Sequence, residues 1–145
     1  MNSVESIALE PLAVRSENVV SLPLGLLGFE RIKRYALLQN PQEAPFRWLQ
    51  VLDDPNLAFL VLSPFLALPD YEPDVANEDV EFLEASSPED VLLFSIVTLR
   101  PNGSATINLK GPIAINRLSL KGKQVVLTNA ARYSIEHPLP VDPEP

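Results

Sequence analysis

The chain has 145 residues, a formal net charge of −8 and no cysteine. This length suffices to bury one sizeable core, so a single domain is expected over residues 1–140, followed by a flexible Pro- and acid-rich tail at 141–145. The lack of cysteine excludes disulfides, thiolate-bound metals and thiol catalysis, and it fits a reducing, cytoplasmic location.

No segment predicts membrane insertion or secretion. The longest uncharged run, residues 55–69, is too short to span a bilayer and contains three prolines. The N-terminal segment contains the acids Glu5 and Glu10 and has no basic region followed by an apolar stretch, which argues against a signal peptide. The Asn-Gly-Ser triplet at 102–104 is therefore interpreted as a hairpin turn and not as a glycosylation site.

Short apolar runs between turn residues predict short strands. They are expected within residues 5–14, 18–22 and 35–39, and over 46–52, 57–63, 91–100, 105–110, 113–118 and 124–128. The last four strands are expected to pair each with the next, as in a meander. One helix is predicted over 77–84 with Asn77 as its N-cap, and a capped turn over 86–90. This pattern predicts a mainly β fold, an antiparallel β-barrel-like roll with one or two short helices.

The acidic residues are unevenly distributed. Residues 48–99 carry eleven of them and no Lys or Arg, whereas the remainder carries eight acids and eleven bases. Direct binding of nucleic acid by the acidic part is disfavoured, because phosphate contacts need clustered bases. A negative field attracts a basic partner, or repels RNA from whatever the protein holds. The alternative is a solvated face that only keeps the chain soluble, and charge alone favours this alternative.

Residues that carry enzymatic chemistry are sparse. His137 is the single histidine and is interpreted as a surface or tail-packing residue, not as a catalytic one. The alternating acids at 70–74 have the spacing of cation ligands, but their prolines and lack of glycine favour turn capping over metal binding. No enzyme activity, metal or cofactor is expected. A β-barrel that binds a small planar ligand is an alternative, although the acidic centre offers no basic group to such a ligand.

The stretch PFLALPDYEPD, residues 64–74, sets apolar side chains beside carboxylates. Its three prolines predict a loop without helix or strand. Four apolar side chains are candidates for a patch that binds a partner: Phe65, Leu66, Leu68 and Tyr71. For Phe65 and Leu68 the favoured interpretation is a plug at one end of the barrel. Three carboxylates are candidates for an acidic face toward a basic partner: Asp70, Glu72 and Asp74.

Six blocks closely resemble the FliW family of bacterial flagellar assembly factors: LPLGLLGFE (22–30), RWLQVLDDPNLAFLVLSPFLALPDYEPD (47–74), EDVLLFSIVTL (89–99), INLKGPIAIN (107–116), KGKQVVL (121–127) and YSIEHPL (133–139). They occur in the family's order and cover about residues 20–139. Gly111 departs from the family pattern NLKAPI, which has Ala there. Three polar residues of the fourth block join the partner-binding candidates: Asn108, Lys110 and Asn116.

The resemblance implies a non-enzymatic, protein-binding regulator. Family members bind the translational repressor CsrA, away from its RNA surface, and alternatively flagellin. Unsecreted flagellin takes the FliW protein from CsrA, which then represses flagellin synthesis. The implied partners are CsrA and flagellin, with no direct nucleic acid and no membrane, and the chain is expected to be a cytoplasmic monomer. An assembly chaperone that binds flagellin alone is the alternative, and CsrA binding separates the two.

Overall fold

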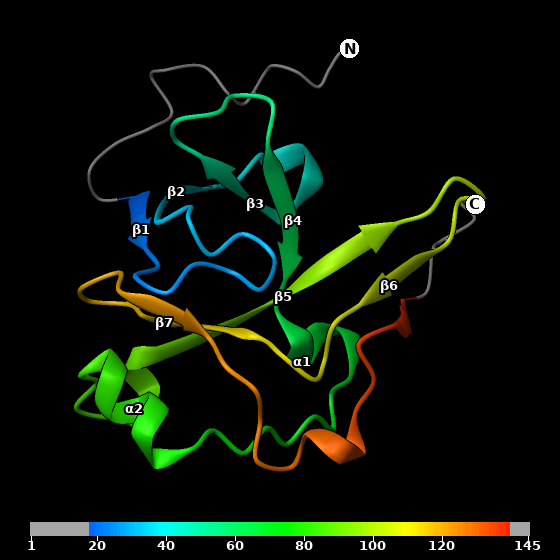
Figure 1. Cartoon of the computed structure of the whole chain (residues 1–145). Coiled ribbons are helices and arrows are strands. Elements are labelled where there is room, and N and C mark those ends of the chain that lie inside the picture. The colour runs from blue at the N-terminus through cyan, green and yellow to red at the C-terminus, as the bar shows by residue number, and fades with distance from the viewer. Residues whose placement is uncertain (1–17, 140–145) are drawn as a thin grey trace.

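The computed structural model describes residues 18–139, which fold into short strands with two short helices (Figure 1). The strands are β1 (Val19–Ser21), β2 (Arg34–Leu38), β3 (Arg47–Val51), β4 (Ala58–Leu62), β5 (Val91–Leu99), β6 (Ala105–Ile107), β7 (Ile113–Asn116), β8 (Gly122–Gln124) and β9 (His137–Leu139). The helices are α1 (Pro64–Ala67) and α2 (Asn77–Leu83), and 3-10 turns occur at η4 (Pro41–Glu43), η5 (Pro88–Asp90) and η6 (Ala130–Arg132). The strand predicted within 5–14 and the tail predicted at 141–145 lie outside the described residues.

All strand pairs are antiparallel, and the main path of the sheet runs β1-β2-β3-β4-β5-β6-β9. β5 crosses the molecule (Figure 1) and pairs with three strands: through residues 95–96 with β4, through residues 91–94 with β7 and through residues 97–99 with β6. β7 also pairs with β8, and one parallel bridge joins Ser21 to Lys121. Within residues 18–139 no ladder joins β1 to β8. The predicted mainly β, antiparallel fold with two short helices is therefore confirmed, but the sheet is not closed into a barrel.

The predicted meander is wrong at one step, because β6 does not pair with β7. The chain turns sharply after β6, where the Oδ1 of Asn108 accepts hydrogen bonds from the backbone N–H groups of Lys110 (3.0 Å) and Gly111 (2.9 Å). β7 then returns to the first half of β5, and β9 takes the place beside β6. His137, interpreted from the sequence as a surface or tail-packing residue, belongs to β9 and so forms part of the sheet.

Several element boundaries also differ from the prediction; β6, for example, ends at Ile107 and not at residue 110. The strand predicted over 124–128 is β8 at Gly122–Gln124, although the backbone N–H of Val125 still donates to the carbonyl of Pro112 at 2.9 Å. Asn77 is the first residue of α2, and Ala76 is its extended N-cap. Two predicted acids do occupy the first turn, Glu78 and Asp79, where the positive end of the helix dipole favours them.

The stretch 64–74 contains a helix, contrary to the loop prediction. Pro64 begins α1, and proline fits the first turn of a helix because its missing N–H needs no partner there. The backbone N–H of Leu68 donates to the carbonyl of Pro64 at 3.0 Å, which closes the single turn. The next proline, Pro69, lies after the C-cap, where it ends the helix. The prolines therefore limit the helix to one turn without preventing it.

Apolar side chains cover both faces of the central strands, as the continuous apolar runs at 57–63 and 91–99 predict. The first cluster contains Val20, Leu22, Leu26, Tyr35, Leu49, Val51, Val61, Phe94, Ile113 and Ile115. The second contains Leu62, Tyr71, Leu83, Val97, Ala105, Ile107, Leu109, Ala114, Val125 and Leu127. Successive residues of a strand can belong to different clusters, because their side chains point to opposite faces of the sheet. In β4, for example, Val61 belongs to the first cluster and Leu62 to the second. Tyr71 brings the segment between the helices into the second cluster.

None of the helices in residues 18–139 is long and apolar enough to cross a membrane.

Candidate functional site

Tyr71 fastens the loop between α1 and α2 to the core. Its side chain is only 3% exposed, and its hydroxyl donates a hydrogen bond to the carbonyl of Leu109 at 2.6 Å. Its ring contacts the rings of Phe65 and Tyr133 edge to face, with centroids 5.6 Å and 4.8 Å away. Burial raises the pKa of Tyr71 well above its usual value, and Tyr133 acts in the same direction. Tyr71 is thus an anchor of the loop and not an exposed contact residue.

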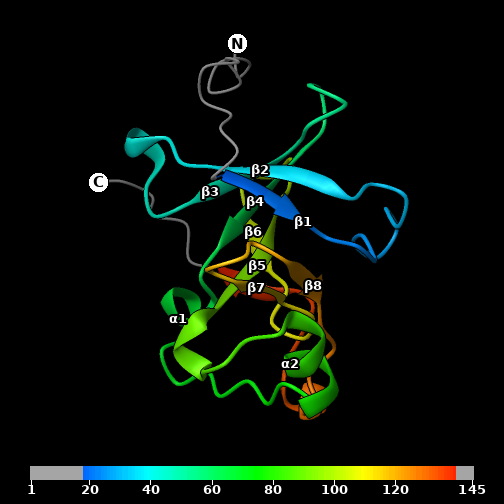
Figure 2. The ribbon, with the colours of Figure 1, turned by 90° about the vertical axis from the view of Figure 1, so that its left-hand side faces the viewer.

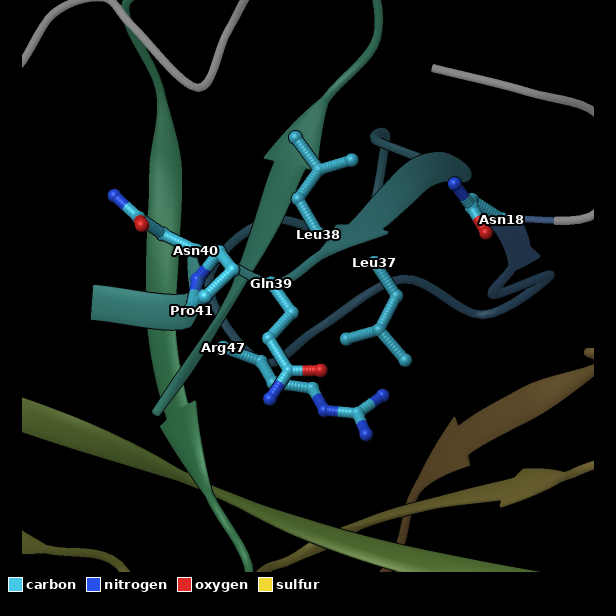
Figure 3. Close-up of a pocket in the computed structure, with 7 residues that line it drawn as sticks. All are labelled: Asn18, Leu37, Leu38, Gln39, Asn40, Pro41 and Arg47. Carbon is cyan, nitrogen blue, oxygen red and sulfur yellow. The ribbon is translucent and has the colours of Figure 1, made fainter. Parts of the chain in front are cut away.

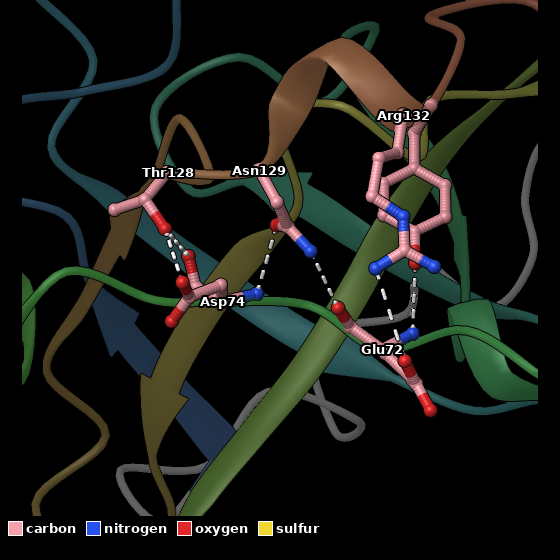
Figure 4. A network of polar contacts seen from close by, with 6 residues as sticks. Glu72, Asp74, Thr128, Asn129 and Arg132 are labelled. Carbon is pink, nitrogen blue, oxygen red and sulfur yellow. Dashed lines mark hydrogen bonds and ion pairs between the residues drawn. The ribbon is translucent and has the colours of Figure 1, made fainter.

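A network of hydrogen bonds holds the rest of this loop against the segment 128–133 (Figure 4). Asn129 accepts from the backbone N–H of Asp74 at 3.0 Å and donates to the carbonyl of Glu72 at 2.8 Å. The Thr128 hydroxyl donates to the Asp74 carboxylate at 2.5 Å. The Tyr133 hydroxyl accepts from the backbone N–H of Glu72 at 3.0 Å. These bonds fix the backbone of the loop on both sides of Pro73.

The fixed loop presents its carboxylates unequally. Asp70 is exposed, and the Glu72 side chain keeps 75% of its surface accessible. The ion pair of Glu72 with Arg132 is long, 3.8 Å, and exposed on both sides, so it contributes little to stability. Asp74 is also exposed but is held by the Thr128 hydroxyl. We define the acidic loop surface as five residues: Phe65, Leu66, Asp70, Glu72 and Asp74.

The apolar members of this surface belong to α1. Phe65 is 44% exposed and Leu66 is 59% exposed. The interpretation of Phe65 as a plug at one end of a barrel is therefore wrong, because its ring lies on Tyr71 at the surface of an open sheet. Leu68 is half-buried and packs against the second core cluster, on the inner side of the loop. The structure thus separates two residues that the sequence interpretation had grouped.

The sequence suggested that none of the eleven acids of residues 48–99 has a basic partner, but some of them do. Asp90 forms an ion pair with Arg117 at 3.0 Å, and the buried Asp79 pairs with Lys123. Both bases lie in the part of the chain that carries the excess of Lys and Arg. The tip of the β3–β4 hairpin, with Asp53 and Asp54, lies at the opposite end of the molecule from α2 (Figure 2).

Most of the remaining exposed acids lie in the loop, in α2 or just after it: Asp70, Glu72, Asp74, Glu78, Glu81, Glu84 and Glu89. An acidic end of the molecule therefore exists, but it is smaller than the charge count predicts. Within residues 18–139 no three His, Asp or Glu side chains converge on a position that suits a metal ion.

The three partner-binding candidates from the block INLKGPIAIN, Asn108, Lys110 and Asn116, have different structural roles. Asn108 shapes the turn after β6, as described above. Asn116 is 5% exposed, and its amide donates to the carbonyl of Leu83 at 2.9 Å and accepts from the backbone N–H of Leu118 at 2.9 Å. Lys110 is half-buried next to Leu109, the residue that receives the Tyr71 hydroxyl. The two asparagines thus use their side chains inside turns.

Sequence reasoning missed the residues that position the acidic loop surface, namely Thr128, Asn129 and Tyr133. Each lies 54 to 61 residues from its partner in the loop. No local sequence pattern predicts such long-range contacts. Asn129 and Thr128 have side chains that form hydrogen bonds readily, but the sequence does not show which residues they bond to.

A separate surface pocket of about 560 Å³ lies where β2 ends and β3 begins (Figure 3). Its lining residues are Asn18, Leu37, Leu38, Gln39, Asn40, Pro41 and Arg47. The guanidinium of Arg47 also lies over the ring of Phe94, 5.6 Å from its centroid. The pocket shares no residue with the acidic loop surface. The small-ligand alternative requires the interior of a closed barrel, and the sheet of the described residues is open.

Comparison with known proteins identifies the family. The model of the FliW protein family matches residues 3–139. The flagellar assembly factor FliW of Treponema denticola is 43% identical over 92% of this chain and 90% of that protein, and the one of Thermotoga neapolitana is 36% identical over 92% and 91%. A crystal structure of the flagellar assembly factor FliW superposes with a TM-score of 0.78, at 34% identity, over 90% of this chain and 91% of that one. The chain therefore belongs to the FliW family of flagellar assembly factors, which are not enzymes.

Proposed function

We propose that the chain is a cytoplasmic partner switch that binds the translational repressor CsrA and, alternatively, flagellin. Binding to CsrA lifts the repression of flagellin synthesis, and flagellin that has not been exported takes the chain away from CsrA. Membership of the FliW family supports this role. The match over residues 3–139 also supports a single domain over residues 1–140, and the chain is proposed to act as a monomer.

The observation that carries the proposal is the rigid acidic loop surface. Tyr71 and Asn129 hold the loop from two sides, while Asp70 and Glu72 remain exposed. A surface that is ordered before binding loses less conformational entropy when a partner docks. Carboxylates beside the exposed apolar side chains of Phe65 and Leu66 fit a basic partner with an apolar contact, which is the chemistry of a protein that binds RNA phosphates. Lys110 is proposed as a rim residue of the same contact.

Charge also provides a way for the chain to oppose RNA binding without covering the RNA site. Exposed carboxylates docked within about 8 Å of an RNA-binding surface act with little screening at physiological ionic strength. They raise the free energy of bringing a phosphate backbone to that surface. The coupling is reciprocal, so bound RNA should weaken the binding of the chain to CsrA by the same factor. The acidic end formed by the loop and α2 supplies these charges.

Purified components test the proposal. CsrA bound to a fluorescent flagellin leader RNA is titrated with the chain, and flagellin is then added. The expected result is release of RNA by the chain and its rebinding to CsrA once flagellin is present. Release of RNA without any effect of flagellin contradicts the switch. Binding to flagellin with no binding to CsrA supports the alternative, an assembly chaperone without a translational partner.

A further inference from the structure

The loop between β1 and β2 exposes three large apolar side chains within six positions. Leu24 is 52% exposed, Leu27 is 68% exposed and Phe29 is 39% exposed. We call these three residues and their connecting backbone the leucine loop, residues 24–29. Single exposed leucines are ordinary on protein surfaces, whereas exposed apolar side chains that cluster are typical of interaction sites. The role proposed above for the acidic loop surface does not involve them.

The leucine loop is held in one conformation. Leu22 and Leu26 are fully buried and anchor it in the first core cluster. The backbone N–H of Leu27 donates to the Oε1 of Gln124 at 2.9 Å, and that of Phe29 donates to the carbonyl of Leu26 at 2.7 Å. The ring of Phe29 meets the ring of Phe59 edge to face, with centroids 5.0 Å apart. The exposed side chains are thus presented by a fixed backbone.

At Gly25 two parts of the loop backbone, residue 25 and residues 29–30, come very close to each other. Its φ of +70° lies in the left-handed region, and a Cβ there would come within 2.6 Å of the Glu30 backbone. Only glycine fits such a position without strain. A chain that needed this turn alone could place polar residues at 24 and 27, where the side chains reach solvent. Leucine at both positions is therefore not explained by the fold.

The charges beside the leucine loop are mainly positive, in contrast to the acidic loop surface. Arg31, Lys33 and Arg34 follow it directly, and all are exposed. Glu30 is the acid among them; its carboxylate accepts from the backbone N–H of Gly28 at 3.1 Å, and the Nζ of Lys33 donates to the carbonyl of Glu30 at 2.6 Å. Figure 2 shows this loop on the side of the molecule away from α1. The chain thus carries two apolar surfaces, one with an acidic border and one with a basic border.

We infer that the leucine loop is a second docking surface, which binds an amphipathic helix that carries carboxylates beside its apolar face. Leu24 and Leu27 supply the apolar contact, and the bases at 31, 33 and 34 pair with the carboxylates. A basic partner is disfavoured here by like charge. The inference rests on the proposed function in one respect: it assigns this surface to the terminal helical region of flagellin and leaves the acidic loop surface to CsrA.

The test uses the full chain with two pairs of substitutions that remove exposed apolar side chains. The variant Leu24→Ser/Leu27→Ser is compared with the matched control Leu99→Ser/Ile135→Ser, whose side chains are 66% and 57% exposed. Affinities for purified flagellin and for purified CsrA are measured by calorimetry. Loss of two central apolar contacts should weaken flagellin binding at least about tenfold. CsrA binding, and both affinities of the control, should stay unchanged.

A charge variant tests the chemistry of the partner. Arg31→Glu/Arg34→Glu should also weaken flagellin binding and flatten its dependence on salt concentration. Flagellin affinity that survives both variants, with the wild-type chain binding both partners, overturns the inference and leaves the proposed function intact. A wild-type chain that binds neither partner contradicts the proposed function itself. A dimer in light scattering that Leu24→Ser/Leu27→Ser dissociates also overturns the inference, because a second copy then covers the loop.

Discussion

The hydroxyl of Tyr71 donates a hydrogen bond to the carbonyl of Leu109 at 2.6 Å, across 38 positions of sequence. This bond joins the loop that carries the exposed carboxylates to the turn between β6 and β7. The ring of the same residue contacts Phe65 on one side and Tyr133 on the other. One buried residue therefore sets the position of the acidic loop surface relative to the sheet.

Substitution of Tyr71 by Phe should destabilise the chain without changing the shape of its core. The ring contacts remain, but the carbonyl of Leu109 loses its buried donor, which costs about 1–3 kcal/mol. Urea unfolding measures the change. A loss much below this range would mean that water reaches the carbonyl and replaces the hydroxyl.

Substitution of Lys123 by Met should be more damaging than an ordinary surface change. The Asp79 side chain is 8% exposed, and Lys123 is its ion-pair partner in the described residues. Lys123 also lies over the ring of Phe82, 5.3 Å from its centroid. Removing the base leaves a buried carboxylate unpaired, at a cost of about 3–5 kcal/mol.

The double variant Asp79→Leu/Lys123→Met is the control for this pair. It removes both charges together, so it should recover much of the stability that Lys123→Met loses. If the two variants are equally unstable in urea, the damage comes from lost packing on Phe82 and not from the buried charge.

Stability should fall at alkaline pH because of Tyr35. Burial raises the pKa of Tyr35 from 10.0 to about 12. Between these two values the unfolded chain releases the proton and the folded chain keeps it, so the free energy of unfolding decreases as the pH rises through this window. Burial acts on Tyr71 in the same direction. In Tyr35→Phe the decrease should be shallower, and an identical pH profile would contradict the assignment to this residue.

Two glycines should respond to alanine in opposite ways. At Gly111 a Cβ would meet its nearest neighbours at 3.5 to 3.7 Å, which is ordinary contact. Gly111→Ala should therefore stabilise the chain by about 0.4–1 kcal/mol, because the unfolded chain loses freedom. At Gly25 the positive φ and the close Glu30 backbone make Ala destabilising by more than that amount. Thermal unfolding of the two variants tests the comparison.

Sequence patterns predicted the elements well where the signal is local. Continuous apolar runs mark β4 and β5, and the acids after Asn77 mark α2. The division of β5 between its partners β7 and β6 has no such signal, because a uniform apolar strand does not show where one partner ends and the next begins. The open edge between β1 and β8 could not be predicted for the same reason, since closure depends on the register of several strands together.

The candidate site shows the same division. The sequence correctly placed exposed carboxylates at 70 and 72, because they stand among prolines in a turn-rich stretch. It did not reveal that Phe65 is 44% exposed while Tyr71 is buried, because the partners that hold Tyr71, Leu109 and Tyr133, lie far from it in the sequence. The ion pairs of Asp79 and Asp90 were missed because their bases come from the distant segment 117–123.

The central claim is that the acidic loop surface binds CsrA, and its most direct test is a titration of CsrA with three forms of the full chain. Asp70→Asn/Glu72→Gln removes two charges from this surface, and Asp53→Asn/Asp54→Asn removes two from the opposite end of the molecule. The first variant should bind CsrA about tenfold more weakly at physiological salt, with a shallower salt dependence, while the second binds like the wild type. Equal affinities for the two variants would contradict the claim.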